Sequence, residues 1–258
     1  MTRTYVVTGA ASGIGKATAE LLTSRGETVI GVDLHDADVT VDLNSPEGRD
    51  ELVTEVARIS GGTIDGVLAI AGLAAESCAT VGVNYFGMIA TLEGLRPLLA
   101  GSPAPRAVGV ASMASLHPVD TELVDDMREM DEPAALLRAS EIESDVTGGR
   151  IYASTKRAFA QWIRRTAPTD DWAGAGIPLN AIAPGVIITP MTAGLLATEE
   201  GREQTRAGVP MPLGGFADAI VPARLLAWLA GEENSHLCGQ VVFVDGGSDA
   251  VIRGDSTW

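Results

Sequence analysis

The most constraining stretch is the N-terminal one, where a β-branched segment runs directly into closely spaced glycines. Residues 4–8 (TYVVT) are typical of a strand, and residues 9–15 (GAASGIG) precede a helical pattern that stops at Gly26. A strand, a glycine turn and a helix place unpaired backbone N–H groups at a helix N-terminus, which suits a pyrophosphate. A glycine turn that serves only tight packing is the alternative for this stretch by itself.

Strands and helices are expected to alternate along the rest of the chain. Expected strands after the first are 28–32, 38–41, 67–71, 108–111, 178–183 and 240–244, and expected helices include 84–97 and 220–230 and one opened by Ser45 and Pro46. This alternation predicts βαβ units. We therefore expect an α/β protein with a single-domain, Rossmann-type doubly wound fold over 1–258, whose mostly parallel seven-stranded sheet has helices on both faces.

Charge and hydrophobicity exclude several kinds of partner. Eighteen basic and 34 acidic residues give a formal net charge of −16, which repels nucleic acid and anionic membranes. No apolar run reaches the ~18 residues of a membrane span, and residues 1–7 lack a signal-peptide core. Cys78 and Cys238 lack metal-ligand spacing, so we expect buried free thiols and no metal. These features predict a cytoplasmic protein.

Tyr152 and Lys156 stand four residues apart in the stretch YASTK. On a helix they share one face. A free phenol titrates near ~10, and a cation nearby favours the phenolate and lowers the phenol pKa toward neutrality. A pair of this kind fits proton transfer, although the spacing alone also fits a core tyrosine beside a surface lysine.

Asp33 stands at the end of the second expected strand. A carboxylate there accepts hydrogen bonds from the ribose hydroxyls of NAD and repels the 2′-phosphate of NADP. Residues 12 and 34 are not basic and do not offset this charge. The sequence therefore predicts NAD as the cofactor.

Residues 116–149 interrupt the alternation. They carry ten acidic and two basic residues, which is half of the net charge. Leu123, Met127 and Met130 fall at helical spacing, so we expect two short amphipathic helices. Long connections in compact domains are usually functional or mobile. We interpret this acidic helical insertion as a lid or an interaction surface, with a solvated surface insertion as the alternative, and expect 190–216 to form a substrate loop.

Taken together, these motifs resemble the short-chain dehydrogenase/reductase family over nearly the whole chain. The matching stretches are TGAASGIG at 8–15, Asp33, DL at 42–43, VNYFG at 83–87, Ser112, YASTK at 152–156, NAIAPG at 180–185 and VDGG at 244–247. The resemblance implies an oxidoreductase that transfers hydride between NAD(H) and a secondary alcohol or ketone. The subgroup most similar to this chain contains 3α-hydroxysteroid dehydrogenase/carbonyl reductases.

The resemblance also implies roles for individual residues. Tyr152 would be the acid/base, Ser112 would hold the substrate oxygen, and Lys156 would lower the Tyr152 pKa and hold the nicotinamide ribose. Asn84 would anchor a proton-relay water, and Thr189 would hold the carboxamide. The implied cofactor-binding residues are Gly9, Ser12, Gly13, Ile14, Gly15, Asp33, Asp42, Leu43, Ala71, Gly72, Tyr152, Lys156, Pro184, Gly185, Ile187 and Thr189.

Two features depart from the family pattern. Residues 69–72 read AIAG where many relatives have NNAG, so the side-chain hydrogen bonds that steady this segment are expected to be missing. The gap between Ser112 and Tyr152 is also long, as in the subgroup named above. Ser115 competes with Ser112 for the catalytic role, although the motif register favours Ser112.

Other functions remain compatible with the sequence. The alternatives on the same fold are a coniferyl-type alcohol dehydrogenase, a 3-oxoacyl carrier-protein or acyl-CoA reductase, and a nucleotide-sugar epimerase. A non-catalytic NAD sensor is the alternative from another class. Asp33 argues against the NADPH that carrier-protein reductases usually use, and the negative charge would repel an acyl carrier.

The resemblance further implies a homo-oligomer. In the family, the helices that correspond to those of Asn84 and Tyr152 often pair across a two-fold axis. Two acidic insertions facing each other near that axis would repel. We therefore expect a homodimer through the helix 220–230 and the strand 240–244, with a tetramer as the alternative.

Overall fold

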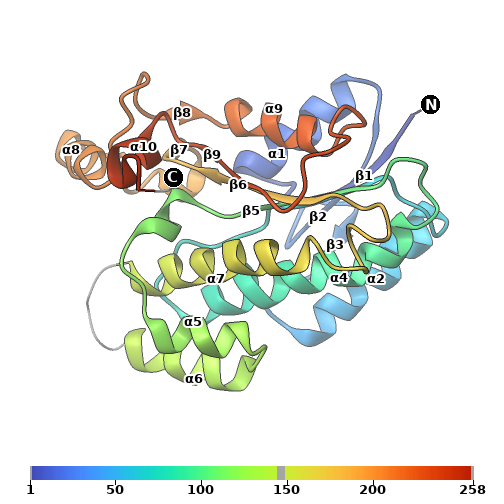
Figure 1. The fold of residues 1–258 in the computed structure, drawn as a ribbon, viewed down its shortest axis with the longest axis horizontal. Helices are drawn as coiled ribbons and strands as arrows, with labels where there is room; N and C mark the ends of the chain where they lie inside the picture. Colours follow the sequence, from blue (N-terminus) through green and yellow to red (C-terminus); the bar gives the residue numbers. More distant parts are fainter. Residues whose placement is uncertain (1, 144–148, 257–258) are drawn as a thin grey trace.

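A seven-stranded parallel sheet forms the centre of the computed structural model, which describes residues 2–143 and 149–256 (Figure 1). Its strand order is β3-β2-β1-β4-β5-β6-β9, and each neighbouring pair is parallel. The strands are β1 (Thr4–Thr8), β2 (Thr28–Asp33), β3 (Val39–Thr40), β4 (Gly66–Ala69), β5 (Arg106–Val110), β6 (Leu179–Pro184) and β9 (Val241–Val244). The expected Rossmann-type fold is confirmed, and this sheet is wholly parallel.

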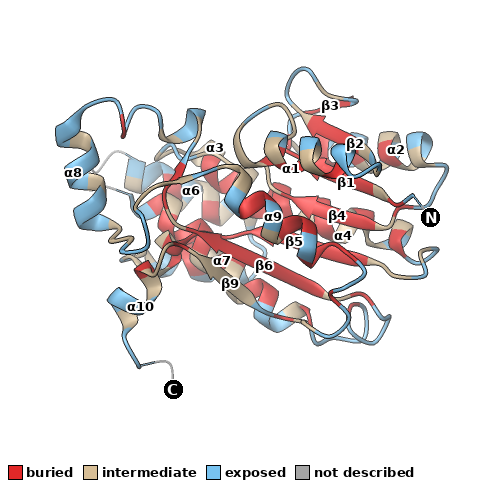
Figure 2. Ribbon diagram, turned by 90° about the horizontal axis from the view of Figure 1, so that it is seen from above, coloured by how far each residue is buried: buried red, intermediate tan, exposed pale blue. Residues whose placement is uncertain are grey.

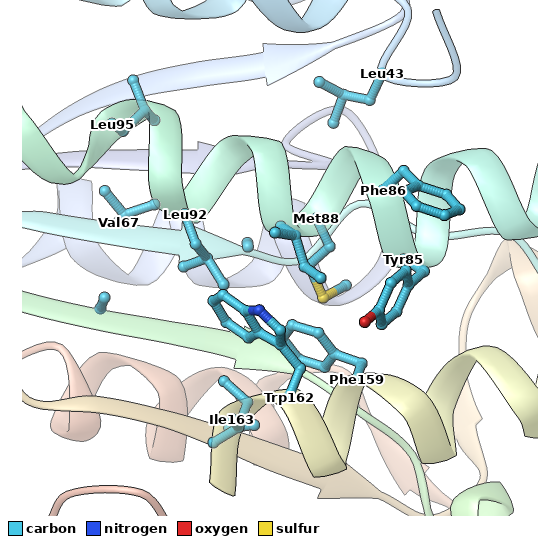
Figure 3. Close-up of a cluster of buried hydrophobic side chains, with 14 of the residues drawn as sticks. Leu43, Val67, Tyr85, Phe86, Met88, Leu92, Leu95, Phe159, Trp162 and Ile163 are labelled. Carbon is cyan, nitrogen blue, oxygen red and sulfur yellow. The ribbon is translucent and has the colours of Figure 1, made fainter. Parts of the chain in front are cut away.

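Helices cover both faces of the sheet. In Figure 1, α1 (Gly13–Ser24) and α9 (Ile220–Leu229) lie above it, and α2 (Pro46–Ser60), α4 (Met88–Leu99) and α7 (Arg150–Thr166) lie below it. In Figure 2 most of the central strands are coloured as buried, whereas β9 at the edge of the sheet is intermediate. In Figure 3, Met88 and Leu92 of α4 meet aromatic side chains of α7, where the rings of Phe159 and Trp162 stack with their centroids 5.9 Å apart.

The strand order places a topological switch point between β1 and β4. From β1 the chain proceeds outward through β2 and β3, then returns to the other side of β1 as β4. In open parallel sheets, ligands bind in the crevice at the carboxyl ends of the strands beside such a point. The fold therefore brings together the segments that follow β1, β2, β4, β5 and β6.

The helix that carries Asn84 differs from the expected helix 84–97. It begins earlier, with α3 (Cys78–Val81), passes through the π-helical turn η1 (Gly82–Gly87), and continues as α4 beyond Pro97. Pro97 does not end the helix because a proline in the last turn removes only one backbone hydrogen bond, and Leu99 is still fully buried. Asn84 thus lies in a π-helical turn, a feature that often marks functional sites.

The acidic insertion forms two helices, α5 (Thr121–Arg128) and α6 (Glu132–Glu143), called here the α5–α6 hairpin. Leu123 and Met127 are fully buried as expected, but Met130 is 49% exposed with φ +60° and lies in the turn between the helices. Arg49 of α2 forms a bidentate ion pair with Glu132 of α6, in which both N–O distances are 2.7 Å. This packing argues against a hairpin that moves freely as a lid. Residues 144–148 of the insertion lie outside the described residues.

The substrate loop expected over 190–216 is partly regular. The short strands β7 (Ile187–Ile188) and β8 (Ala217–Asp218) pair at its base. Between them lie the 3₁₀ turn η3 (Pro190–Thr192) and the helix α8 (Glu199–Gly208), which has no buried residue. A second 3₁₀ turn, η2 (Met113–Leu116), follows β5, and α10 (Ser248–Arg253) follows β9.

Two further expectations concern the cysteines and membranes. Cys78 and Cys238 are free thiols as expected, but both are half-buried rather than fully buried. Among the described residues, no helix has the length and apolar character needed to cross a bilayer.

Candidate active site

Two adjoining pockets lie at the carboxyl ends of the strands. They share Gly9, Ser12, Ala71 and Gly72. The first is also lined by Gly13, Ile14, Gly15, Ile70, Val110, Ala111, Ser112, Tyr152, Lys156, Pro184, Gly185, Ile187, Thr189, Pro190, Met191 and Thr192. The second is also lined by Val32, Asp33, Leu34, Val41, Asp42, Leu43, Asn44, Leu73, Ala79 and Val83. Every cofactor-binding residue implied by the resemblance therefore lines one of these two pockets.

The glycine turn after β1 has a backbone that requires glycine. Gly9 and Gly13 have φ angles of +71° and +53°, a region that other residues rarely adopt. A Cβ at Gly15 would lie 2.1 Å from the carbonyl oxygen of Gly9. The N-cap of α1, Ser12, makes no side-chain cap bond, and the first turn has no acidic residue. These features fit a cradle for the pyrophosphate of a dinucleotide.

Asp33 joins the end of β2 to the glycine turn. Its Oδ2 accepts a hydrogen bond from the Ala11 N–H at 2.9 Å, and its Oδ1 accepts one from the Leu34 N–H at 2.7 Å. The half-buried carboxylate lines the second pocket with Asp42 and Leu43. This is the end of the crevice where the ribose of the adenosine half would lie.

Thr8 supplies hydrogen bonds to the segment that lacks the family's asparagines. Its Oγ1 accepts hydrogen bonds from the backbone N–H groups of Ile70 and Ala71 at 2.9 and 3.0 Å. Asn84 forms two hydrogen bonds with the backbone of Leu73 in the same segment. Its Oδ1 accepts one from the Leu73 N–H at 2.7 Å, and its Nδ2 donates one to the Leu73 carbonyl at 2.8 Å. Hydrogen bonds from Thr8 and Asn84 therefore hold the segment after β4 in place. The role of Thr8 was not predicted from the sequence, although its position at the end of β1 could have indicated it.

Ser112 and Tyr152 meet in the first pocket. Ser112 follows β5 as the N-cap of η2, and its Oγ accepts a hydrogen bond from the Ala114 N–H at 3.1 Å. Because that oxygen is already an acceptor, its O–H is left to donate. The Ser112 side chain lowers the pKa of the Tyr152 phenol. Ser115 does not line this pocket, so the geometry favours Ser112 as the motif register does.

Lys156 is almost fully buried beside the Tyr152 ring. Its Nζ lies 5.6 Å from the centre of the Tyr152 ring and donates a hydrogen bond to the Val110 carbonyl at 2.9 Å. Burial lowers the pKa of Lys156 to about 7. Burial also raises the pKa of Tyr152, against the effect of Ser112. Desolvation disfavours the charged form of each group, which gives both pKa shifts their net direction. The expectation that Lys156 lowers the Tyr152 pKa stays a prediction.

Asn84 lies behind the pocket rather than in its lining. Its side chain is fully buried, and its Nδ2 is 3.4 Å from the Thr155 Oγ1 on α7. A Cβ built on Gly72 would lie 3.1 Å from Asn84 Oδ1 and 3.7 Å from Lys156 Nζ. Glycine at position 72 thus keeps side-chain atoms away from the space between the amide and the ammonium.

The expected substrate loop contributes residues to the first pocket. Met191 and Pro190 line it, and neither was singled out from the sequence. Met191 is also largely exposed, as are Ile188, Leu195 and Leu213 in the same region. No motif marks these residues, because loop packing decides which of them face the pocket.

The sequence profile of the family described as "Enoyl-(Acyl carrier protein) reductase" matches residues 9–249. The chain belongs to the short-chain dehydrogenase/reductase family. Its full-length relatives include dehydrogenases and reductases, and the expected enzyme class, an oxidoreductase acting on CH–OH groups, is confirmed. The match begins in the glycine turn and ends in α10, and thus includes every candidate site residue.

Relatives of this short-chain dehydrogenase/reductase match nearly their full lengths. The 3-alpha-hydroxysteroid dehydrogenase/carbonyl reductase of Comamonas testosteroni is 33% identical over 96% of this chain and 97% of its own. The coniferyl-alcohol dehydrogenase of Pseudomonas sp. (strain HR199 / DSM 7063) is 31% identical over 94% of each. The crystal structure of the 3-alpha-hydroxysteroid dehydrogenase from Pseudomonas sp. B-0831 complexed with NADH has a TM-score of 0.89 at 39% identity, covering 98% of this chain and 99% of that chain.

Proposed function

We propose that this enzyme transfers hydride between NAD(H) and a secondary alcohol or ketone. The observation that carries the proposal is the gathering of Ser112, Tyr152 and Lys156 in one pocket that continues into the glycine turn. The adjoining pocket carries Asp33, whose charge disfavours the 2′-phosphate of NADP. The enzyme similar to it at 39% identity is complexed with NADH.

Each residue of the pocket has a proposed role. NAD, when bound, supplies the hydride acceptor. Tyr152 takes the hydroxyl proton of the substrate, and Ser112 donates a hydrogen bond to the substrate oxygen. Lys156, with a pKa of about 7, exchanges protons near neutral pH with a water anchored by Asn84. Pro184, Gly185, Ile187 and Thr189 would hold the nicotinamide.

The substrate class we propose is a bulky apolar alcohol or ketone, with a 3α-hydroxysteroid as its representative. Ile188, Met191, Leu195 and Leu213 are exposed apolar side chains in or next to the expected substrate loop, and Met191 lines the first pocket. They support this proposal because exposed apolar surface marks binding sites. Two similar enzymes are named for 3-alpha-hydroxysteroids. An acyl carrier protein fits less well, because its phosphopantetheine would approach a protein with a net charge of −16.

The test is NAD reduction measured over a panel of alcohols. The panel contains a 3α-hydroxysteroid, coniferyl alcohol and a small alicyclic alcohol, each assayed with NAD and NADP. We expect the highest kcat/KM with the steroid and NAD, and none above background with Tyr152→Phe. Turnover of coniferyl alcohol alone would favour the aryl-alcohol alternative, and no turnover of any alcohol or of the corresponding ketones would refute the proposal.

We also propose that the protein forms a homodimer through α9 and β9. The outer face of α9 exposes Val221 and Trp228, at 40% and 44%. Strand β9 is the last in the sheet, so one of its edges is unpaired. The α5–α6 hairpin packs on α7 and η1, which belong to the helices of Tyr152 and Asn84 that often pair across a two-fold axis in the family.

A cytoplasmic location is the last part of this proposal. It is supported by the free thiols of Cys78 and Cys238, since reducing compartments keep such thiols unpaired. Cell fractionation of the native host with an antibody to the protein would test the location.

A further inference from the structure

A carboxylate from a distant segment holds the first turn of α7, which carries Tyr152. Glu76 Oε2 accepts a hydrogen bond from the Ile151 N–H at 2.8 Å, and its Oε1 accepts one from the Tyr152 N–H at 3.1 Å. The N-cap residue of the helix, Gly149, has φ +83° and provides no side-chain cap. The first N–H groups of a helix have no intrahelical acceptor, so Glu76 supplies what the N-cap residue does not.

Glu76 itself is fixed by the segment that follows β4. In that segment, Ala71 and Gly72 line the cofactor pocket, and Leu73 is hydrogen-bonded twice to Asn84. The next anchor is the Ala75 carbonyl, which accepts a hydrogen bond from the Thr80 hydroxyl. The backbone that precedes Glu76 is therefore held by hydrogen bonds at Leu73 and Ala75, which helps to fix the position of its carboxylate.

The position of Tyr152 makes it sensitive to this contact. As the third residue of α7, it lies in the first turn, and its own backbone N–H is one of the groups that Glu76 binds. Bonds from backbone N–H groups to a carboxylate are charge-assisted, and a negative charge at a helix N-terminus is favoured by the helix dipole. Loss of the carboxylate would leave the turn that carries the phenol without its two side-chain acceptors.

We propose that Glu76 is a positioning residue for Tyr152. Its carboxylate sets the first turn of α7 so that the phenol stays in reach of Ser112 and of the substrate oxygen. The kinetic consequence rests on the proposed function, because it assumes that Tyr152 transfers the proton. Misplacement of a reacting group by ~1 Å can lower a rate by about 100-fold.

The kinetic test compares Glu76→Ala, Glu76→Gln and Val56→Ala with the wild type. Val56 is fully buried in α2 and lines neither pocket, so its variant controls for lost stability alone. Positioning predicts that Glu76→Ala lowers kcat about 10- to 100-fold, with the Kd of NADH and the substrate KM nearly unchanged. Glu76→Gln keeps one acceptor oxygen and should fall between wild type and Glu76→Ala, and Val56→Ala should keep its kcat.

Two kinetic results would overturn the proposal. One is a kcat in Glu76→Ala within twofold of wild type at full folding. The other is a raised Kd for NADH with kcat unchanged, which would assign the carboxylate to the cofactor segment instead. If Glu76→Ala does not fold, Glu76→Gln decides by the same two criteria.

A second measurement does not depend on activity. The chain has three tyrosines, so 3-fluorotyrosine labelling gives three ¹⁹F signals, and Tyr152→Phe assigns one of them. In Glu76→Gln the Tyr152 signal should shift or broaden while those of Tyr5 and Tyr85 stay in place. An unchanged Tyr152 signal refutes the positioning role. A shifted Tyr152 signal in Glu76→Gln, together with a wild type that turns over no alcohol and no ketone, would refute the proposed function alone.

Discussion

The ammonium of Lys156 lies 5.6 Å from the centre of the Tyr152 ring and is hydrogen-bonded to the Val110 carbonyl at 2.9 Å. The pair therefore shares one helix face, as its spacing predicts, and β5 holds the lysine in place. What the spacing does not show is burial. Burial lowers the pKa of Lys156 to about 7 and raises the pKa of Tyr152.

Tyr152→Phe should abolish most turnover and leave NADH binding intact. The substitution removes only the hydroxyl that transfers the proton, and such groups contribute about 10²–10⁴-fold in rate. Steady-state kinetics and NADH titration measure the two effects. Tyr5→Phe, which changes a buried tyrosine of β1 that lines neither pocket, is the matched control. A Tyr152→Phe enzyme with half the wild-type kcat would contradict the assignment.

The buried lysine should make stability rise with pH between about 7 and 10.5. In this window the folded Lys156 is largely neutral, whereas the unfolded lysine, with its ordinary pKa of 10.5, still binds a proton. The unfolded state then binds more protons, so raising the pH favours the folded state, by at most about 1.4 kcal/mol per pH unit. Below about pH 7 both states are protonated and this contribution no longer changes.

Urea unfolding at pH 7, 8 and 9 measures that slope. Lys156→Met has no proton to bind at this position, so its unfolding free energy should depend less steeply on pH than that of the wild type. Equal slopes for the two proteins would show that Lys156 remains charged in the folded state.

Asp33→Ala should weaken NAD binding and narrow the preference for NAD over NADP. It removes a charge that repels the 2′-phosphate, and it also releases the N–H groups of Ala11 and Leu34. The readout is kcat/KM for each cofactor. Asp36→Asn is the control, because it removes a nearby charge that lines neither pocket. Equal kcat/KM for the two cofactors in the wild type would be incompatible with this role.

Tyr85→Phe should stabilise the protein by about 1 kcal/mol, because a buried hydroxyl without a partner costs ~1–3 kcal/mol. The Tyr85 side chain is fully buried (Figure 3), and its hydroxyl has no hydrogen-bond partner among the described residues. Burial raises its pKa to about 12. Tyr5→Phe is the opposite case, since the Tyr5 hydroxyl accepts a bond from Arg3 Nε at 2.7 Å and its loss should destabilise. Chemical denaturation measures the unfolding free energy of both variants against the wild type. A Tyr85→Phe variant less stable than the wild type would indicate that the Tyr85 hydroxyl has a hydrogen-bond partner after all.

Sedimentation at moderate salt should show a dimer. Trp228→Glu on the exposed face of α9 should dissociate it, because the substitution buries a charge in the proposed interface. Leu137→Glu, on the exposed side of the α5–α6 hairpin, should not. A stable tetramer assembled through α7 would show that the hairpin does not block that contact.

The sequence by itself determined the elements whose chemistry is local. The glycine turn follows from spacing because glycine adopts the positive φ angles at positions 9 and 13 far more readily than other residues do. The cap of α2 by Ser45 also follows, since the bond from the Gly48 N–H spans three residues. Alternating strands and helices predicted the parallel sheet, and the family's motifs predicted many of the residues that line both pockets.

Only the tertiary structure decided the features that join distant segments. Glu76 reaches the first turn of α7, Thr8 replaces the missing asparagines, and the α5–α6 hairpin packs into the core through Leu123 and Met127. None of these contacts leaves a periodic pattern, because each depends on how two segments far apart in sequence pack together. The pKa values of Tyr152 and Lys156 belong to the same class, since desolvation depends on every element that surrounds them.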